Sequence, residues 1–362
     1  MTSHLIKIRL WFLIIFSLSA ISSFMAMAND FSQESHLNNS LNNEIALFWQ
    51  SGKFSSFQGV DDKRVNYAAF IKNEKAPCLV ISPGRSEGYL KYQEMAFDLY
   101  KQPFNLFIID HRGQGLSERL LDNPHKGYVK HFDDYADDLH FFINTEIKNH
   151  CSLSSKPLLL SHSMGGAIAI RMMQKYPHTI KAALLSSPMI AINKGGLPDW
   201  LAKTLINSGQ FFNNIFSDQA WYFVGQGDYQ ANTFEDNTLM QSAIRYENFI
   251  NLYKQEPKLQ LGGVTFNWLK QAIATHSRIF EQLDKITTPV TILQAGDDTV
   301  VDNQAQNHFC SALNKLNPDF CQNGQPIIIA DAKHELFFEK DIYRNQALAA
   351  IVNWLKLNQN ND

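Results

Sequence analysis

Six short apolar runs, separated by segments with helical spacing, constrain this sequence most strongly. Each run is apolar on both faces, as expected for a strand that is buried between two layers of helices. The runs are CLVIS (78–82), FNLFIID (104–110), PLLLSH (157–162), IKAALLSS (180–187), VTILQ (290–294) and PIIIA (326–330). Their alternation with amphipathic helices predicts an α/β fold, in which a mostly parallel sheet carries helices on both faces. Residues 53–60 and 64–72 precede the series and predict an antiparallel hairpin.

Residues 191–281 interrupt this alternation. They contain no comparable strand run, but they are rich in aromatic side chains such as Trp200, Phe211 and Phe212. The simplest interpretation is an all-helical cap inserted between two strands of the sheet, with the core formed by residues 44–190 and 282–358. An aromatic-rich cap could receive an acyl chain, although we expect most of these side chains to pack the cap onto the core.

The N-terminus has the pattern of a secretory signal peptide. Lys7 and Arg9 precede an apolar segment at 10–21 and a small-x-small site ending at Ala28. We therefore predict a signal peptide over residues 1–28 and export to the periplasm or to a membrane, with an uncleaved membrane anchor as the alternative. The polar, Asn- and Ser-rich residues 29–43 predict a flexible tether.

Export bears on the four cysteines, because an oxidising compartment permits disulfides. Cys310 and Cys321 are close in sequence and are the natural pair. Cys78 and Cys151 each precede a strand and would be neighbours if those strands pair, but free buried thiols remain an alternative for them. The chain has no Cys-x-x-Cys motif. Its net charge of −3, with no basic stripe, argues against a nucleic-acid partner.

The segment PLLLSHSMGGAIAI places a serine between an apolar strand and a helical pattern. Ser163 would stand on the sharp turn between them, as in the nucleophile elbow G-x-S-x-G, where small neighbours permit a strained turn. Ser161 replaces the first glycine, and we interpret it as small enough for that position. Gly165 keeps the last one. Alone, this pattern is a weak indication of a catalytic serine.

Two later strands end beside groups that could activate this serine. AGDDTVVD follows one strand and DAKHELFFEKD follows the next. A serine nucleophile needs a histidine base and a carboxylate that orients it. Ser163, Asp298 and His334 follow three separate strands in the order Ser–Asp–His, which is the order of the α/β-hydrolases. Asp297 is the alternative acid, and the position of Asp298 directly before T-V-V favours Asp298.

Other polar residues near these motifs have plainer interpretations. His334 does not open a zinc site of the H-E-x-x-H type, because position 338 is Phe338, so we predict no metal. We expect His111 and His162 to pack or to support neighbouring groups rather than to catalyse. Arg112 is a candidate for holding the DHRGQG turn.

The chain resembles the bacterial lysophospholipases of the monoacylglycerol-lipase-like α/β-hydrolase group. The resemblance extends from about Phe48 to the C-terminus and rests on PGRSEGYLKY, IIDHRGQGLSERLLDNPHKGYV, SHSMGGAIAI, LQAGDDTVVDN and KHELFFEKD. It implies an α/β-hydrolase fold with a mostly parallel eight-stranded sheet, an inserted helical cap and no cofactor.

The resemblance also implies roles for individual residues. Ser163 would be the nucleophile, Asp298 the acid and His334 the base, with the backbone N–H groups of Arg85 and Met164 forming the oxyanion hole. The implied reaction is hydrolysis of the one remaining acyl ester of a lysophospholipid at a membrane surface. The alternatives are a monoacylglycerol lipase, a broad carboxylesterase or an inactive lipid-binding protein. The Arg85 side chain could also bind a phosphate, as a further hypothesis.

Overall fold

The computed structural model describes residues 31–74, 76–152, 155–193, 195 and 198–359 of the 362-residue chain. One sheet of eight strands has the order β1-β2-β4-β3-β5-β6-β7-β8. The strands are β1 Lys53–Gln58, β2 Arg64–Phe70, β3 Cys78–Ser82, β4 Asn105–Ile109, β5 Leu158–His162, β6 Ala182–Ser186, β7 Val290–Ala295 and β8 Ile327–Ile329. β1 and β2 form the predicted hairpin, β2 pairs with β4 antiparallel, and all other pairs are parallel. The predicted α/β class and the six predicted strands are confirmed.

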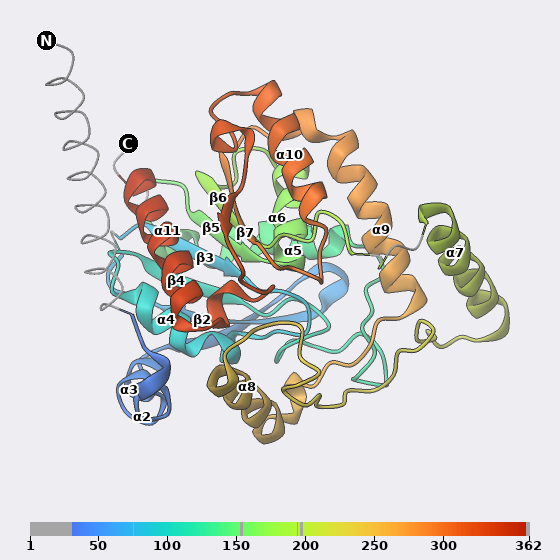
Figure 1. The fold of residues 1–362 in the computed structure, drawn as a ribbon, viewed down its shortest axis with the longest axis horizontal. Helices are drawn as coiled ribbons and strands as arrows, with labels where there is room; N and C mark the ends of the chain where they lie inside the picture. Colours follow the sequence, from blue (N-terminus) through green and yellow to red (C-terminus); the bar gives the residue numbers. More distant parts are fainter. Residues whose placement is uncertain (1–30, 75, 153–154, 194, 196–197, 360–362) are drawn as a thin grey trace, which may run out of the picture.

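Helices cover both faces of the sheet, whereas α7 stands away from it (Figure 1). The helices of the described residues are α2 Leu37–Asn42, α3 Glu44–Gln50, α4 Gln93–Tyr100, α5 Asp133–Phe141, α6 Met164–Lys175, α7 Asp199–Phe216, α8 Ala243–Gln255, α9 Phe266–Glu281, α10 Asn303–Leu316 and α11 Asp341–Gln359. Neighbouring strand residues point to opposite faces. Val80 therefore packs in one buried cluster with residues of α5, α6 and α10, whereas Leu79 and Ile81 pack in another with residues of α4 and α11.

The connection between β6 and β7 contains the predicted cap, but only part of it is helical. α7, α8 and α9 lie in this connection, and no helix forms over residues 217–242, all of which the structure describes. Apolar residues do not recur at helical spacing in this stretch, and side chains form hydrogen bonds with some of its backbone N–H and carbonyl groups. The Asn213 amide, for example, accepts the N–H of Trp221 at 2.8 Å and donates to the carbonyl of Gln219 at 2.7 Å. The expectation of an all-helical insertion is wrong for this stretch.

The segment predicted as a flexible tether is ordered, so that prediction is wrong for residues 31–43. A 3-10 turn at Glu34–His36 leads into α2, and Phe31 and Leu37 are buried. The polar composition of the segment was misleading because protein groups, rather than water, satisfy its polar atoms. The Ser32 N–H donates to Asp98 Oδ1 at 3.0 Å, and the Ser32 hydroxyl donates to Asp98 Oδ2 at 2.7 Å.

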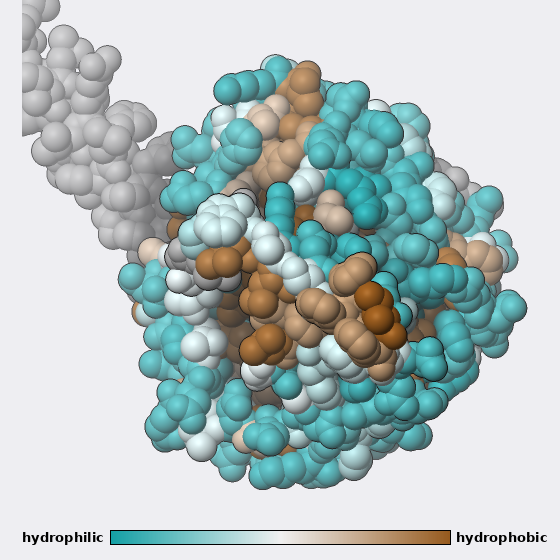
Figure 2. All heavy atoms as spheres, turned by 90° about the vertical axis from the view of Figure 1, so that its right-hand side faces the viewer, coloured by the Kyte–Doolittle hydropathy of each residue, from teal (hydrophilic) through white to brown (hydrophobic). Residues whose placement is uncertain are grey.

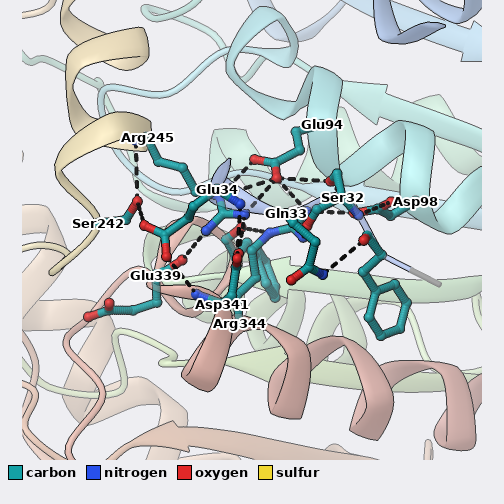
Figure 3. A network of polar contacts seen from close by, with 12 residues as sticks. Ser32, Gln33, Glu34, Glu94, Asp98, Ser242, Arg245, Glu339, Asp341 and Arg344 are labelled. Atoms are coloured by element: carbon teal, nitrogen blue, oxygen red, sulfur yellow. Dashed lines mark hydrogen bonds and ion pairs between the residues drawn. The ribbon is translucent and has the colours of Figure 1, made fainter. Parts of the chain in front are cut away.

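Glu34 ties this segment to the cap and to the C-terminal helix (Figure 3). One of its carboxylate oxygens accepts the hydroxyl of Ser242, the residue that caps the N-terminus of α8, at 2.5 Å. Its other oxygen accepts the N–H of Asp341, the first residue of α11, at 3.1 Å. Three segments that are far apart in the sequence therefore meet at one carboxylate.

Two buried arginines complete what we call the N-terminal charge network. Arg245 donates to Glu94 and to Asp341, each at 2.8 Å. Arg344 donates to Asp98 and to the carbonyl of Phe337, each at 2.9 Å. The network consists of Ser32, Glu34, Glu94, Asp98, Ser242, Arg245, Glu339, Asp341 and Arg344, of which the labelled side chains converge in Figure 3.

The four cysteines lie in two pairs within the described residues. Cys78 is bonded to Cys151, with Cα atoms 5.4 Å apart, and Cys310 to Cys321, with Cα atoms 5.2 Å apart. The predicted signal peptide over residues 1–28 lies outside the described residues. In the part of the chain that is described, we find no helix with the length and apolar character needed to cross a membrane.

Candidate active site

Ser163 stands at the junction of β5 and α6, on a strained turn. Its φ of 51° and ψ of −116° lie in a region that side-chain-bearing residues rarely adopt. The turn is held on both sides, because its N–H donates to the carbonyl of Ser186 at 3.0 Å and its own carbonyl accepts the N–H of Met189 at 2.9 Å. These contacts hold the Ser163 side chain beyond the carboxyl end of the strand.

The small residues around Ser163 allow three segments to approach closely. A Cβ atom added to Gly165 would lie 2.2 Å from the carbonyl oxygen of Ser82, and one added to Gly166 would lie 2.6 Å from the Cβ of Pro188. Ser161, at the unusual first position of the elbow pattern, is fully buried in β5 and pairs with Ser82 of β3. A serine is therefore accommodated at this position.

The structure brings the three predicted side chains into one hydrogen-bonded line. His334 Nε2 lies 2.9 Å from Ser163 Oγ, and His334 Nδ1 lies 2.7 Å from Asp298 Oδ2. The other oxygen of Asp298 accepts the N–H groups of Val300 at 2.8 Å and Val301 at 3.1 Å, which fixes the carboxylate. A ring protonated on Nδ1 donates to Asp298 and accepts the hydroxyl of Ser163. The alternative acid, Asp297, is exposed.

Two backbone N–H groups lie next to Ser163. Met164 begins α6, and the first N–H groups of a helix have no partner within it. Gly84 approaches from β3, since a Cβ atom on it would lie 3.2 Å from Ser163 Cβ. The Gly84 N–H already donates to Glu87 Oε2 at 2.6 Å, whereas the N–H of Arg85 has no hydrogen-bond partner among the described residues. Arg85 and Met164 are therefore available to an oxyanion.

A buried lysine joins the loop that carries Arg85 to the loop that carries His334. Lys91 Nζ lies 2.8 Å from Glu87 Oε1 and 2.7 Å from Glu335 Oε2, and all three side chains are buried. Burial raises the pKa of Glu87, but the charge of Lys91 together with the hydrogen bonds from Lys91 and Tyr92 brings it below its usual value. Glu87, His162 and Glu335 are close enough together to hold a cation. Lys91 already lies between the two carboxylates, and burial raises the pKa of Glu335, which favours its neutral form.

The DHRGQG loop supports the same region from the other side. Its Gln114 amide donates to the carbonyls of Gly84 at 2.7 Å and Glu87 at 2.9 Å. Asp110 accepts the N–H of Leu116 at 2.7 Å, which closes the loop on itself. Arg112 does not bond within the turn. It pairs with Asp138 of α5, with 2.5 Å between Nε and Oδ2.

Two histidines beside the motifs are buried and neutral. Burial lowers the pKa of His111 to about 3 and that of His162 to about 4. His111 Nε2 lies 2.8 Å from Ser82 Oγ, and the ring of His162 packs 4.9 Å from the ring of His334. Their contacts fit the packing and support that the sequence predicts for them.

Sequence reasoning assigned no role to Gln114, Glu87, Lys91 or Glu335, although these residues position the site. The four-residue spacing of Glu87 and Lys91 was no helical signal, because Gly88 between them is extended and the 3-10 turn begins only at Tyr89. Nothing local pointed to Glu335, because its contact with Lys91 joins residues 244 positions apart.

Comparison with known proteins gives a consistent result. The family described as "Hydrolase_4: Serine aminopeptidase, S33" matches residues 73–341. The lysophospholipase L2 of Escherichia coli strain K12 is 37% identical over 307 residues, covering 85% of this chain and 88% of that protein. The probable lysophospholipase L2 of Haemophilus influenzae is 33% identical over 319 residues, covering 87% of this chain and 95% of that protein.

The same architecture is present in solved structures. A soluble variant of monoglyceride lipase from Saccharomyces cerevisiae, in complex with a substrate analog, superposes with a TM-score of 0.63. The match covers 84% of this chain and 94% of the yeast chain at 17% identity, which supports the fold.

Proposed function

We propose that this chain, which belongs to the serine aminopeptidase S33 family of α/β-hydrolases, cleaves the acyl ester of lysophospholipids with a Ser–His–Asp triad. At the coarser level the relatives are decisive, and the chain is a serine hydrolase acting on lipid esters. The observation that carries the finer proposal is the hydrogen-bonded line from Asp298 through His334 to Ser163.

In the proposed reaction, Ser163 Oγ attacks the ester carbonyl while His334 Nε2 takes its proton. Asp298 holds the imidazole in the required orientation and stabilises its protonated form. His334 then returns the proton to the departing glycerol oxygen, which leaves an acyl-enzyme. Water, activated by the same histidine, attacks this acyl group and releases the fatty acid.

Negative charge develops on the carbonyl oxygen during both attacks. The N–H groups of Arg85 and Met164 would donate to it, and removal of one such donor elsewhere has cost about 3–4 kcal/mol of transition-state stabilisation. The hydrogen bonds from Lys91 to Glu87 and from Gln114 to the carbonyl of Gly84 hold the loop that carries Arg85. No cofactor is needed for this chemistry.

The cap offers a place for the acyl chain. A cavity of about 400 Å³ lies between α7 and α9, with apolar lining residues that include Ile206, Leu269, Ile273 and Phe280. It also reaches Ile192, which bridges to Val301 in the loop that carries Asp298. An apolar cavity beside the site suits a fatty acyl group.

The outer face of α7 supports binding to a membrane surface. Seven of its large apolar side chains are exposed, namely Trp200, Leu201, Leu205, Phe211, Phe212, Ile215 and Phe216. Figure 2 shows brown residues gathered on the face where α7 lies. An apolar patch of this kind on a single helix is typical of an interfacial contact, and lysophospholipids reside at such interfaces. Together with the pattern of residues 1–28, it supports our proposal of an exported, membrane-associated enzyme.

The test is fatty-acid release by the purified protein from three esters: oleoyl lysophosphatidylethanolamine, monoolein and a short p-nitrophenyl ester. We expect turnover of the first, with kcat/KM above that for the other two, and no turnover of any by Ser163→Ala. Equal kcat/KM for all three would contradict a dedicated lysophospholipase and favour a broad carboxylesterase. Preference for monoolein would favour a monoacylglycerol lipase, and no release would favour a lipid-binding protein.

A further inference from the structure

The half-buried Arg85 lacks the anionic partner that the buried arginines of the described residues have. Its Nη2 donates to the carbonyl of Gly262, and it stacks 5.5 Å from the centroid of the Trp268 ring. Its Nε is buried with no hydrogen-bond partner, and no carboxylate of the described residues forms an ion pair with it. Burial lowers the pKa of Arg85 to about 10, so the group still carries its charge at neutral pH.

Arg85 lines a cavity of about 620 Å³ that lies against the candidate active site. On the core side the cavity begins at Arg85, one residue after Gly84, which approaches Ser163. On the cap side it includes Leu239, whose carbonyl accepts the N–H of Glu335 at 2.9 Å. The cavity therefore borders the loop of the oxyanion hole, and its Leu239 contacts the loop that carries His334.

A second residue of the cavity wall carries an unsatisfied donor. The hydroxyl of Tyr229 is buried and has no hydrogen-bond partner among the described residues. A buried hydroxyl or guanidinium without a partner costs free energy, and native proteins leave few such groups. Arg85 and Tyr229 both line this cavity, and each carries such a donor just below the cavity surface. A ligand with acceptor oxygens in the cavity would satisfy them after a small rotation of the two side chains.

We propose that this cavity receives the phosphodiester of the lysophospholipid head group, with the Arg85 side chain and the Tyr229 hydroxyl as its donors. The proposal rests on the proposed function. A phosphodiester carries a negative charge and two free oxygens, which match the charged fork of a guanidinium and a phenolic donor. The glycerol of the leaving group links the ester at Ser163 to this phosphate.

The arrangement gives a physical basis for choosing among lipid esters. A lysophospholipid fills the cavity with an anion and satisfies both donors. A monoacylglycerol with the same acyl chain has only hydroxyl groups to offer, so the guanidinium stays without a counter-charge. The two side chains thus act as specificity determinants for the head group.

The experiment measures a ratio, namely kcat/KM for oleoyl lysophosphatidylethanolamine divided by kcat/KM for monoolein. Both substrates share the acyl chain and the ester, so the ratio isolates the head group. We expect Arg85→Met to lower it about 10- to 100-fold, as for loss of a charged hydrogen bond. Tyr229→Phe should lower it about 3- to 10-fold. Arg85→Lys keeps the charge but loses the planar pair of guanidinium donors, so its ratio should lie between those of the wild type and Arg85→Met.

A matched control is Arg64→Met, which removes an exposed arginine of β2 that lies outside this cavity. We expect its ratio to equal that of the wild type. A second readout is competitive inhibition by glycerophosphoethanolamine, which should weaken in Arg85→Met and in Tyr229→Phe. If Arg85→Met does not fold, Tyr229→Phe decides the question by both readouts.

The outcomes separate this inference from the proposed function. If the wild type hydrolyses both lipids and neither variant changes the ratio or the inhibition, the head-group site is wrong and the hydrolase remains. If the wild type does not hydrolyse the lysophospholipid at all, the proposed function itself fails.

Discussion

Two regions of this molecule use buried charge in opposite ways. In the N-terminal charge network, Arg344 is fully buried and meets the carboxylate of Asp98 and the carbonyl of Phe337. Beside the candidate active site, the half-buried Arg85 meets one carbonyl and no carboxylate of the described residues. Because an unpaired buried charge costs free energy, the first region has the pattern of a structural clamp and the second that of a site completed by a ligand.

Backbone strain separates the same two regions. Ser163 has a φ of 51°, outside the region that its side chain favours, and the hydrogen bonds around it hold it there. In the N-terminal segment there is no such strain. Gln33 is extended, Glu34 begins the 3-10 turn, and neither residue has a positive φ. The comparison predicts that changes at the site reduce activity, whereas changes in the network reduce stability.

The largest expected effect is that of Asp298→Asn. We expect kcat/KM to fall about 10,000-fold, because an amide cannot hold the histidine tautomer that accepts the serine proton. The free energy of unfolding should change little, since the amide oxygen can still accept the N–H groups of Val300 and Val301. Steady-state kinetics measures the loss of kcat/KM, and urea unfolding measures the free energy of unfolding. Asp297→Asn is the matched control, and a comparable loss there would transfer the role of the acid to Asp297.

Arg344→Met should show the reverse pattern. Removing one partner of a buried ion pair costs about 3–5 kcal/mol, so the midpoint of urea unfolding should fall while kcat of the folded enzyme is retained. Lys101→Met is the control, because Lys101 pairs with the same Asp98 at 3.2 Å from a side chain that is 42% exposed. That variant should lose less than about 1 kcal/mol. Equal losses in the two variants would contradict the distinction between the buried and the exposed partner.

Acid should destabilise the protein through its buried histidines. The pKa of His162 is about 4 in the folded protein against an ordinary value of 6.5, so the unfolded chain binds this proton first as pH falls. The associated stability is complete above pH 6.5 and is lost as pH falls toward 4, to a total of about 3 kcal/mol.

Urea unfolding of the wild type and of His162→Gln, each at neutral pH and near pH 5, checks this effect. The variant cannot take up the proton, so its stability should fall less with acid. Parallel losses in the two proteins would show that His162 is not the group responsible.

The smallest effect concerns the strained turn. Ser163→Gly should be more stable than Ser163→Ala by about 1 kcal/mol, because glycine adopts the backbone angles of this position without steric cost. Thermal unfolding of the two inactive variants measures the difference. A more stable alanine variant would mean that the turn relaxes when the hydroxyl is lost.

The sequence predicted the parts of the molecule that depend on local pattern. The strands and the residues that follow them were recognisable, because period and position place Ser163, Asp298 and His334 at one edge of a parallel sheet. The ordered N-terminal segment was not, since Glu34 meets Asp341 across 307 positions and its polar composition favoured solvent. The sequence also could not show that Arg85 lacks a carboxylate partner among the described residues, because this depends on which acidic side chains the fold brings near it.

The most direct test of the account is covalent labelling of the protein with a fluorophosphonate, followed by mass spectrometry of its peptides. The account predicts a single adduct on Ser163, no adduct in Ser163→Ala, and strongly slowed labelling in His334→Ala. An adduct that persists in Ser163→Ala, or a wild-type protein that takes up no label, would contradict the assignment of Ser163 as the nucleophile.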